Sequence, residues 1–348
     1  MNRQLLKRIC NAPGVPGFEN AAQAVATDVL SGCCDEVTRD HIGNVIGLKK
    51  ATKAPANGKR PIRVMLAAHS DEVGMMVKHI NGNGFIHFIQ MGGLGSDVAQ
   101  SQRVIIHGSK PVRGVVVPKG GADGKTAPLG DLLIDTGLSQ KQLEKLVSPG
   151  DTVTFENDVS LLNGMMWVGR NFDDRIGSYT LLEAMRTLGD TSVDVYAVST
   201  VQEEVGLRGA RPAAFSVAPD IGIAIDGSMA RGAYVNDRDN LCEPGKGTGI
   251  YVIDKLTIGH PGLVSYLCDL CEKNKIAYQR NIGGGTDAAA IQQSRGGVIA
   301  TTVGAPVRHM HSTVQLCHAD DMDATVAMLV GFMETAHEFY SSLDYVTP

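Results

Sequence analysis

The sequence predicts an α/β fold: a mixed, largely parallel sheet flanked by helices, into which a small β-barrel-like domain is inserted. Residues 64–69, VMLAAH, form a continuous apolar run of the kind found in buried parallel strands. After residue 165, strand patterns alternate with helical patterns, which favours a parallel sheet with helices on both faces. Between residues 75 and 165, short β-like runs separated by Gly, Pro and Asp are typical of a small barrel or sandwich.

The amino-terminal part supplies a helix and the first strands of the sheet. Residues 18–34 have helical periodicity, and residues 44–50, NVIGLKK, are typical of a strand. A loop that contains Pro and Lys, at residues 51–61, separates this strand from the apolar run at 64–69.

The middle of the chain is predicted to form the inserted β-rich domain. Its strand-like runs lie at residues 84–91, 103–108, 112–118, 131–137 and 151–157. The predicted division is therefore an α/β domain made of residues 1–73 and 166–348, with a β-rich insertion at 74–165.

The carboxyl-terminal part carries the remaining alternation of helices and strands. Helical patterns occupy residues 178–188, 210–217, 260–275 and 319–340, and the last of them is long and amphipathic. Apolar strand patterns lie between them, at residues 193–201, 221–226 and 297–305.

Composition excludes several classes of protein. The 348 residues are 43% hydrophobic and 20% charged, with a net charge of -5 and no basic cluster, so nucleic-acid binding has no electrostatic support. No segment approaches the roughly 18 apolar residues of a membrane span. Because the amino terminus also lacks the apolar core of a signal peptide, we expect a cytoplasmic protein with neither a nucleic-acid nor a membrane partner.

The seven cysteines are odd in number and irregularly spaced, which favours reduced thiols over a disulfide framework. Cys268 and Cys271 form a C-x-x-C pair inside the predicted helix at 260–275. A structural zinc site needs a second pair of ligands, and none is apparent, so we interpret both as buried helix thiols.

Acidic and imidazole side chains recur where the predicted strands end. Ligands of α/β proteins gather at this edge of the sheet, and imidazole together with carboxylate suits zinc and related ions. Each motif alone is weak, but charges that follow apolar strands must be solvated, paired or ligated. The residues are His69, Asp71, Glu72, Glu203, Glu204, Asp226, His309 and His311, together with Asp173 and Asp174 before a helix.

The spacing within these motifs suits a metal-dependent reaction. His69 and Asp71 can project to the same side, so that Asp71 accepts a hydrogen bond from the imidazole nitrogen that does not bind metal. The adjacent Glu203 and Glu204 diverge, so that one binds metal while the other reaches a water as general base. A carboxylate that bridges two ions would come from the Asp173–Asp174 pair.

Six motifs resemble those of the M42 family of metallo-aminopeptidases, in the same order along the chain. The resemblance covers nearly the whole sequence, from PGVPGFE at residues 13–19 to the last helix. The motifs are AAHSDEVG (67–74), NFDDRIG (171–177), QEEVGLRGA (202–210), AIDGS (224–228), GGGTDAAAI (283–291) and RHMHS (308–312).

The resemblance implies a dinuclear-metal exopeptidase fold and the release of N-terminal amino acids from short peptides. It implies two divalent ions, zinc or cobalt, with manganese also suited to such ligands. It also implies that the insertion at 74–165 serves dimerisation and that the chain self-associates, as a dimer-based dodecamer.

The resemblance also implies a role for each site residue. The metal ligands would be His69 and Asp226 on one ion, Glu204 and His311 on the other, and Asp173 as the bridge. Glu203 would be the general base and acid, and Asp71 would orient His69. Asp174 would follow Asp173 across a cis peptide bond, and Thr286 and Asp287 would line the substrate pocket. The chain departs from the family pattern at Asn171, Phe172, His309 and Met310, which leaves side-chain preference open.

Other functions remain as alternatives. A related hydrolase that acts on acylated amino acids or on C-terminal residues would use the same ligands. A glycosidase needs two carboxylates that flank a sugar, which leaves the histidines unexplained. A non-catalytic metal-binding assembly protein has no need of Glu203.

The preferred first residue of the peptide is not predicted. Arg231, Arg238 and Lys246 follow the strand at 221–226. They either favour an acidic first residue or are solvated loop charges.

Overall fold

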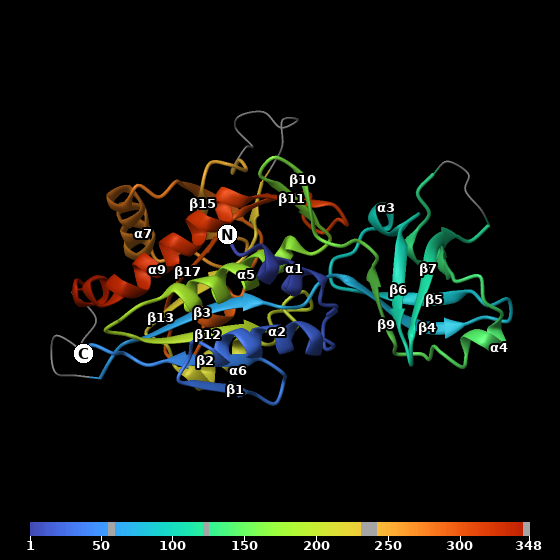
Figure 1. Ribbon diagram of the computed structural model, residues 1–348, viewed down its shortest axis with the longest axis horizontal. Helices are drawn as coiled ribbons and strands as arrows, with labels where there is room; N and C mark the ends of the chain where they lie inside the picture. The colour runs from blue at the N-terminus through green and yellow to red at the C-terminus, as the bar shows by residue number, and fades with distance from the viewer. Residues whose placement is uncertain (55–59, 121–124, 231–241, 344–348) are drawn as a thin grey trace.

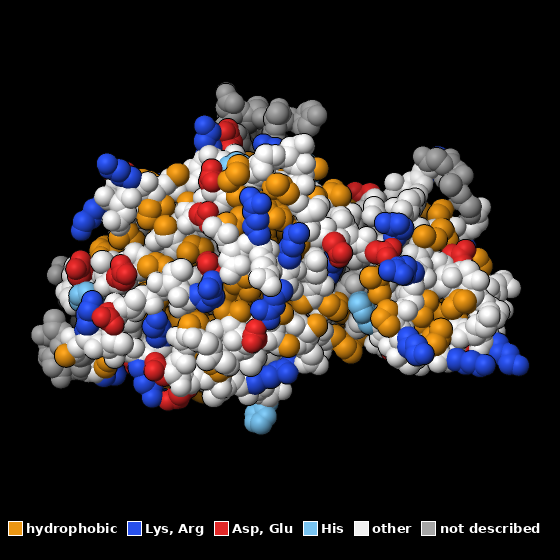
Figure 2. Space-filling model, viewed as in Figure 1, with side chains coloured by type: hydrophobic (Ala, Val, Ile, Leu, Met, Phe, Trp, Pro, Cys, Tyr) orange, Lys and Arg blue, Asp and Glu red, His pale blue; other side chains and the backbone are white. Residues whose placement is uncertain are grey.

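The computed structural model describes residues 1–54, 60–120, 125–230 and 242–343. It has an α/β body and a β-barrel, which lies at one end of the long axis of the molecule (Figure 1). On the face drawn in Figure 2, basic and acidic side chains are interspersed. The predicted fold class, a mixed and largely parallel sheet with helices plus a barrel, is confirmed.

The main sheet of the body has eight strands, and its centre is parallel. Neighbouring pairs β12–β3, β3–β13 and β13–β17 all run in the same direction, so these strands present their carboxyl ends at one edge. In spatial order the strands are β1 (Glu36–Arg39), β2 (Val45–Lys49), β12 (Asp194–Thr200), β3 (Arg63–His69), β13 (Ile221–Ile225), β17 (Ile299–Gly304), β15 (Thr248–Asp254) and β16 (Tyr278–Gly283).

Helices cover both faces of this sheet because successive residues of each strand point in opposite directions. Val64 and Leu66 of β3 face a large core, whereas Met65 and Ala67 face a smaller one. The large core is built by α1 (Arg3–Asn11), α2 (Asn20–Ser31), α5 (Phe172–Thr187), α7 (Pro261–Asn274) and α9 (Ala319–Ser341). The smaller core is built by α6 (Ala210–Val217) and α8 (Ala288–Gln292).

A second sheet of five short strands lies beside the start of α5 and was not predicted from the sequence. Its strands are only two to four residues long, too short for a period-2 pattern to be recognised. In spatial order they are β10 (Ser160–Asn163), β11 (Met166–Gly169), β19 (Gln315–His318), β18 (Pro306–Arg308) and β14 (Ser228–Met229).

The middle of the chain forms a closed six-stranded barrel with its own core. Alternate side chains such as Val104, Ile106, Val153 and Phe155 point inward and are buried. In spatial order the strands are β4 (Gly74–Ile80), β5 (Ile86–Met91), β8 (Leu132–Asp135), β7 (Pro111–Pro118), β6 (Arg103–His107) and β9 (Thr152–Phe155). Three short helical segments complete it: α3 (Ser96–Ala99), η1 (Leu129–Asp131) and α4 (Gln140–Leu143).

The state of the cysteines and the length of the apolar helices were also predicted from the sequence. All seven cysteines are free, and Cys268 and Cys271 are buried thiols of α7, as predicted. Among the described residues, no helix is both long enough and apolar enough to cross a membrane.

Gly304, at the end of β17, is required by the close approach of the neighbouring strand. A Cβ atom there would overlap the backbone carbonyl of Asp226, the residue that follows β13. We expect Gly304→Ala to lower the free energy of unfolding by about 1–3 kcal/mol, because the overlap is with backbone that cannot rotate away.

Chemical denaturation of the metal-free protein measures this effect. Gly296→Ala is the matched control, since a Cβ at this exposed position meets nothing within 4 Å. An unchanged denaturation midpoint for Gly304→Ala would contradict the close approach.

Candidate metal centre

Three strand ends bring the predicted ligands together. β3 ends at His69, β12 is followed within four residues by Glu203 and Glu204, and β13 is followed at once by Asp226. Because β3 is parallel to both neighbours, these side chains lie at the same edge of the sheet.

The His69 imidazole is buried among carboxylates. Its Nε2 atom lies 3.2 Å from Asp173 Oδ1 and 3.9 Å from Glu203 Oε2. Burial lowers the pKa of His69, but hydrogen bonds with Asp173 and Asp71 outweigh it and raise the pKa well above its ordinary value.

Asp71 connects this imidazole to the loop after β12. Its backbone carbonyl oxygen is 3.2 Å from His69 Nδ1, and its carboxylate is 3.5 Å from the same nitrogen. The two carboxylate oxygens accept hydrogen bonds, each of 3.0 Å, from the backbone N–H groups of Glu203 and Glu204. One buried side chain therefore sets the position of the ring and of the loop that carries both glutamates.

Asp173 and Asp174 lie at the start of α5 and are joined by a cis peptide bond, as the resemblance implies. The Asp173 carboxylate lies between two histidines, with Oδ1 3.2 Å from His69 Nε2 and Oδ2 3.3 Å from His311 Nε2. Asp174 turns toward the backbone, where it accepts hydrogen bonds from the N–H groups of His69 and Gly177.

His311 reaches the cluster from the loop between β18 and β19. Its Nδ1 atom is 2.9 Å from the carbonyl oxygen of Gly93, in the connection that follows β5 of the barrel. This contact leaves Nε2 facing Asp173. His309, two residues earlier, is exposed and does not line the pocket described below.

Carboxylates outnumber histidines in the part of the cluster that the structure describes. Within the described ranges, its carboxylates form ion pairs with His69 and His311 but with no Lys or Arg. Burial raises the pKa of Glu203 and Asp226 well above ordinary values, and burial together with Asp173 raises the pKa of Glu204 to about 7. Because a buried carboxylate is costly to ionise without a partner, nearby cations would stabilise the ionised form of these groups.

The donor atoms suit divalent metal ions. Ligand atoms of His69, Asp173 and Glu204 lie within 4.8 Å of one another, and so do those of His69, Asp174 and Asp226. Imidazole nitrogens and carboxylate oxygens are ordinary ligands of zinc and related ions. The residues present therefore fit a metal site. Asp174, which the resemblance leaves outside the ligand set, belongs to the second of these groups.

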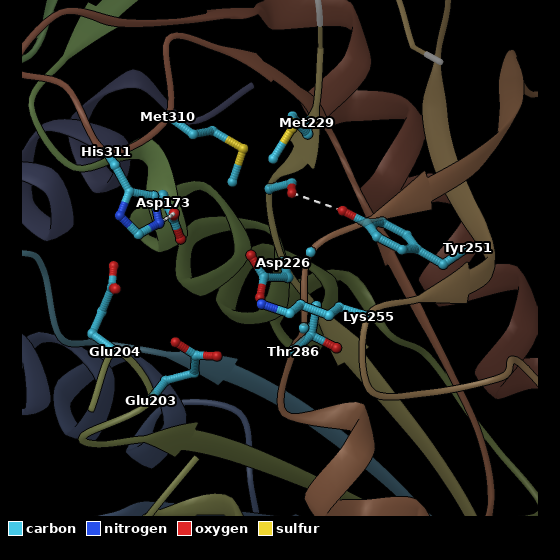
Figure 3. A pocket seen from close by; sticks show the side chains of 13 residues that line it. Asp173, Glu203, Glu204, Asp226, Met229, Tyr251, Lys255, Thr286, Met310 and His311 are labelled. Atoms are coloured by element: carbon cyan, nitrogen blue, oxygen red, sulfur yellow. Dashed lines mark hydrogen bonds and ion pairs between the residues drawn. The ribbon is translucent and has the colours of Figure 1, made fainter. Parts of the chain in front are cut away.

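A pocket of about 260 Å³ opens beside the cluster (Figure 3). Thr286 lines it, whereas Asp287 lies behind it, fully buried, and accepts a 2.6 Å hydrogen bond from the Thr200 hydroxyl. The lining residues are Asp173, Glu203, Glu204, Asp226, Gly227, Met229, Tyr251, Lys255, Gly284, Gly285, Thr286, Met310 and His311. Sequence reasoning missed Met229, Tyr251 and Lys255, because they lie in no recognisable motif.

Sequence reasoning also missed a buried ion-pair network beneath the site. Glu72 accepts hydrogen bonds from Arg170 Nε at 2.8 Å and from the backbone N–H of Gly14 at 3.2 Å. The fully buried Arg175 donates to the carbonyl oxygen of Ser70 at 2.8 Å. These contacts hold the segment after β3 against the start of α5. In the sequence, Glu72 lies in AAHSDEVG and Arg175 in NFDDRIG, whereas Arg170 directly precedes that motif, and nothing local indicates that these charges pair.

The chain is similar to a known protein family and to characterised relatives. The family model described as M42 glutamyl aminopeptidase matches residues 43–328. Lysyl aminopeptidase from Pyrococcus furiosus is 32% identical over 346 residues, which cover 95% of this chain and 96% of that protein.

Solved structures agree with this assignment. An aminopeptidase from the archaeon Desulfurococcus kamchatkensis superposes with a TM-score of 0.94 at 32% identity, covering 99% of this chain and 98% of the other. The TET1 peptidase of Pyrococcus horikoshii, which can assemble into a tetrahedron or a large octahedral shell, superposes with a TM-score of 0.84 at 28% identity. That match covers 95% of this chain and 98% of the other.

The order of the six motifs, the fold and these matches all agree, and the family expected from the motifs is confirmed. The chain belongs to the M42 family of glutamyl aminopeptidases, which are metal-dependent hydrolases.

Proposed function

We propose that this aminopeptidase releases N-terminal amino acids from short peptides with the help of two divalent metal ions, zinc or cobalt. The observation that carries the proposal is the position of Asp173, whose two carboxylate oxygens each face a different histidine, His69 and His311. A carboxylate in this position is suited to bridge two ions. Asp226 would complete the first site with His69, and Glu204 the second with His311.

Bound ions would polarise the scissile carbonyl and lower the pKa of a coordinated water. The chain's own part in the reaction falls to Glu203. This side chain lines the pocket, is 12% exposed, and is held by the backbone hydrogen bond from its N–H to Asp71. Its carboxylate would take the proton of the attacking water and deliver it to the leaving amine.

The dimensions of the pocket favour an exopeptidase. A cavity of about 260 Å³ accommodates one side chain rather than an extended peptide. The free amine of the substrate would lie among the carboxylates of the cluster, so that an acetylated amine would lose this attraction. The remainder of the peptide would extend toward solvent.

We further propose that residues 74–165 form a dimerisation domain and that dimers assemble into a dodecamer. The closed barrel has its own hydrophobic core and contacts the site through Gly93 and His311. The Pyrococcus horikoshii relative, with which the chain superposes, assembles into closed shells. Enclosed sites would restrict substrates to short unfolded peptides. The seven free thiols favour a cytoplasmic location.

Metal dependence and direction of cleavage can be measured together. Protein stripped with a chelator and refilled with zinc or cobalt should release the first residue of free-amine peptides, and acetylation of the amine should abolish release. The chelated protein should be inactive, because the carboxylates alone provide no activated water.

Three outcomes would contradict this proposal. Metal-dependent cleavage of acylated amino acids alone, or of C-terminal residues alone, would establish the related hydrolase. No hydrolysis of any substrate would favour a non-catalytic metal-binding assembly protein.

Glu203→Gln should lower kcat roughly 10²–10⁴-fold, because the amide cannot accept the proton of the attacking water. The variant should still bind metal, since Glu203 is not one of the proposed ligands. Turnover of a peptide substrate and metal content per chain are the two measurements.

Glu144→Gln, at the exposed residue that directly follows α4 in the barrel, is the matched control and should keep wild-type kcat. If Glu203→Gln retained near-full activity, the assignment of the general base would be wrong.

A further inference from the structure

The pocket beside the metal centre has a second wall, which the proposed chemistry does not use. Tyr251, Lys255 and Thr286 belong to it, and Figure 3 shows them on the side of Asp226 away from Glu204 and His311. Tyr251 is buried, and its hydroxyl donates to the carbonyl oxygen of Gly227 at 2.9 Å. Its polar group is therefore satisfied, and its ring serves as a surface of the pocket.

Lys255 is the cation of this wall. Among the described residues that line the pocket, it is the single Lys or Arg, and Figure 3 shows its side chain extending toward Asp226 and Thr286. Within the described part of the chain, its ammonium group forms no hydrogen bond or ion pair. Its three donors are thus available to a ligand in the pocket.

The turn that carries Lys255 is held from both sides. The Asp254 carboxylate accepts hydrogen bonds from the backbone N–H groups of Leu256 at 2.6 Å and Thr257 at 2.5 Å. The Thr286 hydroxyl donates to the same carboxylate at 3.3 Å.

Gly285 allows Leu256 to pack directly on the neighbouring loop, because a Cβ atom there would lie 2.6 Å from Leu256 Cδ1. The backbone of Lys255 is therefore fixed relative to the pocket, while its long side chain stays free to adjust.

We propose that Lys255 binds the side-chain carboxylate of the first residue of the peptide and makes the enzyme prefer N-terminal Glu or Asp. This inference rests on the proposed aminopeptidase function, since it assigns the pocket to the first side chain of the substrate. A carboxylate there would form a charge-assisted hydrogen bond with the ammonium group. Arg231, Arg238 and Lys246 are the basic residues that the sequence suggests for such a role.

None of these three residues is placed in the pocket by the described part of the structure. Arg231 and Arg238 lie outside the described residues, and Lys246 is exposed and does not line the pocket.

The charges around the pocket predict an order of preference. The cluster carboxylates would be neutralised by the bound ions and the substrate amine. Among the described residues of the pocket, Lys255 then remains as the charge that faces the first side chain. A lysine side chain would be repelled by it. A leucine side chain would contact Met229 and Met310 and leave the ammonium group in water, because Lys255 is exposed. We therefore expect the order glutamate, leucine, lysine.

The test is kcat/KM of the metal-loaded enzyme on the p-nitroanilides of glutamate, leucine and lysine. Lys255→Met should lower kcat/KM for the glutamate substrate roughly 10- to 100-fold, the effect of losing one hydrogen bond to a charged group. Most of this loss should appear as a higher KM. For the leucine substrate, kcat/KM should change by less than about threefold. Lys255→Glu should make lysine the preferred substrate over glutamate.

Two variants serve as controls. Lys255→Arg keeps the positive charge and should keep the preference for glutamate. Lys273→Met removes an exposed lysine of α7, outside this pocket, and should leave all three substrates unchanged.

The outcomes separate this inference from the proposed function. If Lys255→Met still hydrolysed the leucine substrate and kept the wild-type ratio of kcat/KM for glutamate p-nitroanilide to kcat/KM for leucine p-nitroanilide, only the role of Lys255 would be overturned. An equal loss of kcat/KM on all three substrates would also overturn this role, because Lys255 would then support the metal cluster or the stability of the fold rather than select the first side chain. If the metal-loaded wild type hydrolysed none of the three, the aminopeptidase proposal itself would fail.

Discussion

The parallel alignment of β12, β3 and β13 is the constraint on which the rest of the molecule depends. It places His69, the loop with Glu203 and Glu204, and Asp226 at one edge of the main sheet. Asp71 then joins two of these strand ends, since its carboxylate receives the backbone N–H groups of both glutamates while it lies against the His69 ring. A change of strand register would separate all these groups at once.

Positive charge from Lys and Arg is absent from the cluster but present directly beneath it, in the described part of the molecule. Glu72 is paired with Arg170, and Arg175 holds the backbone of Ser70. In the same described ranges, the carboxylates of the cluster form ion pairs only with His69 and His311. The supporting layer therefore contains its own ion pair, whereas the carboxylates above it would be paired with the proposed metal ions.

The pocket is asymmetric in a way that suits its proposed task. One wall holds the acidic groups and histidines that would bind metal and the substrate amine. The other wall presents Tyr251, Thr286 and Lys255, which has no ion pair with any residue that the structure describes. Chemistry and selection of the first residue would thus depend on different side chains, so selectivity could vary among relatives without disturbing the metal ligands. The lysyl aminopeptidase of Pyrococcus furiosus and the glutamyl name of the family model indicate such variety.

The local sequence was sufficient for five strands at the centre of the main sheet, for most of its helices and for the proposed ligands. The strands β1, β15 and β16 and the helices α1 and α8 were not predicted. Buried parallel strands read as apolar runs, and the acids and histidines follow them directly, as at His69 and Asp226. The same periodicity indicated a barrel or sandwich for the middle of the chain. The five-stranded sheet was missed because its strands are too short to show a period.

The pocket wall that faces the proposed metal ligands could be found only from the tertiary structure. Lys255 follows Asp254 in an unremarkable turn, and its place in the pocket arises from hydrogen bonds to Asp254 and from the packing of Leu256 on Gly285. The pairing of Glu72 with Arg170 likewise joins residues 98 positions apart. The sequence alone determined the family, the central strands of the main sheet and the candidate metal ligands, because strand patterns and motifs are local. The tertiary structure decided the pocket wall and the supporting ion pairs, because those contacts join segments that are distant in the chain.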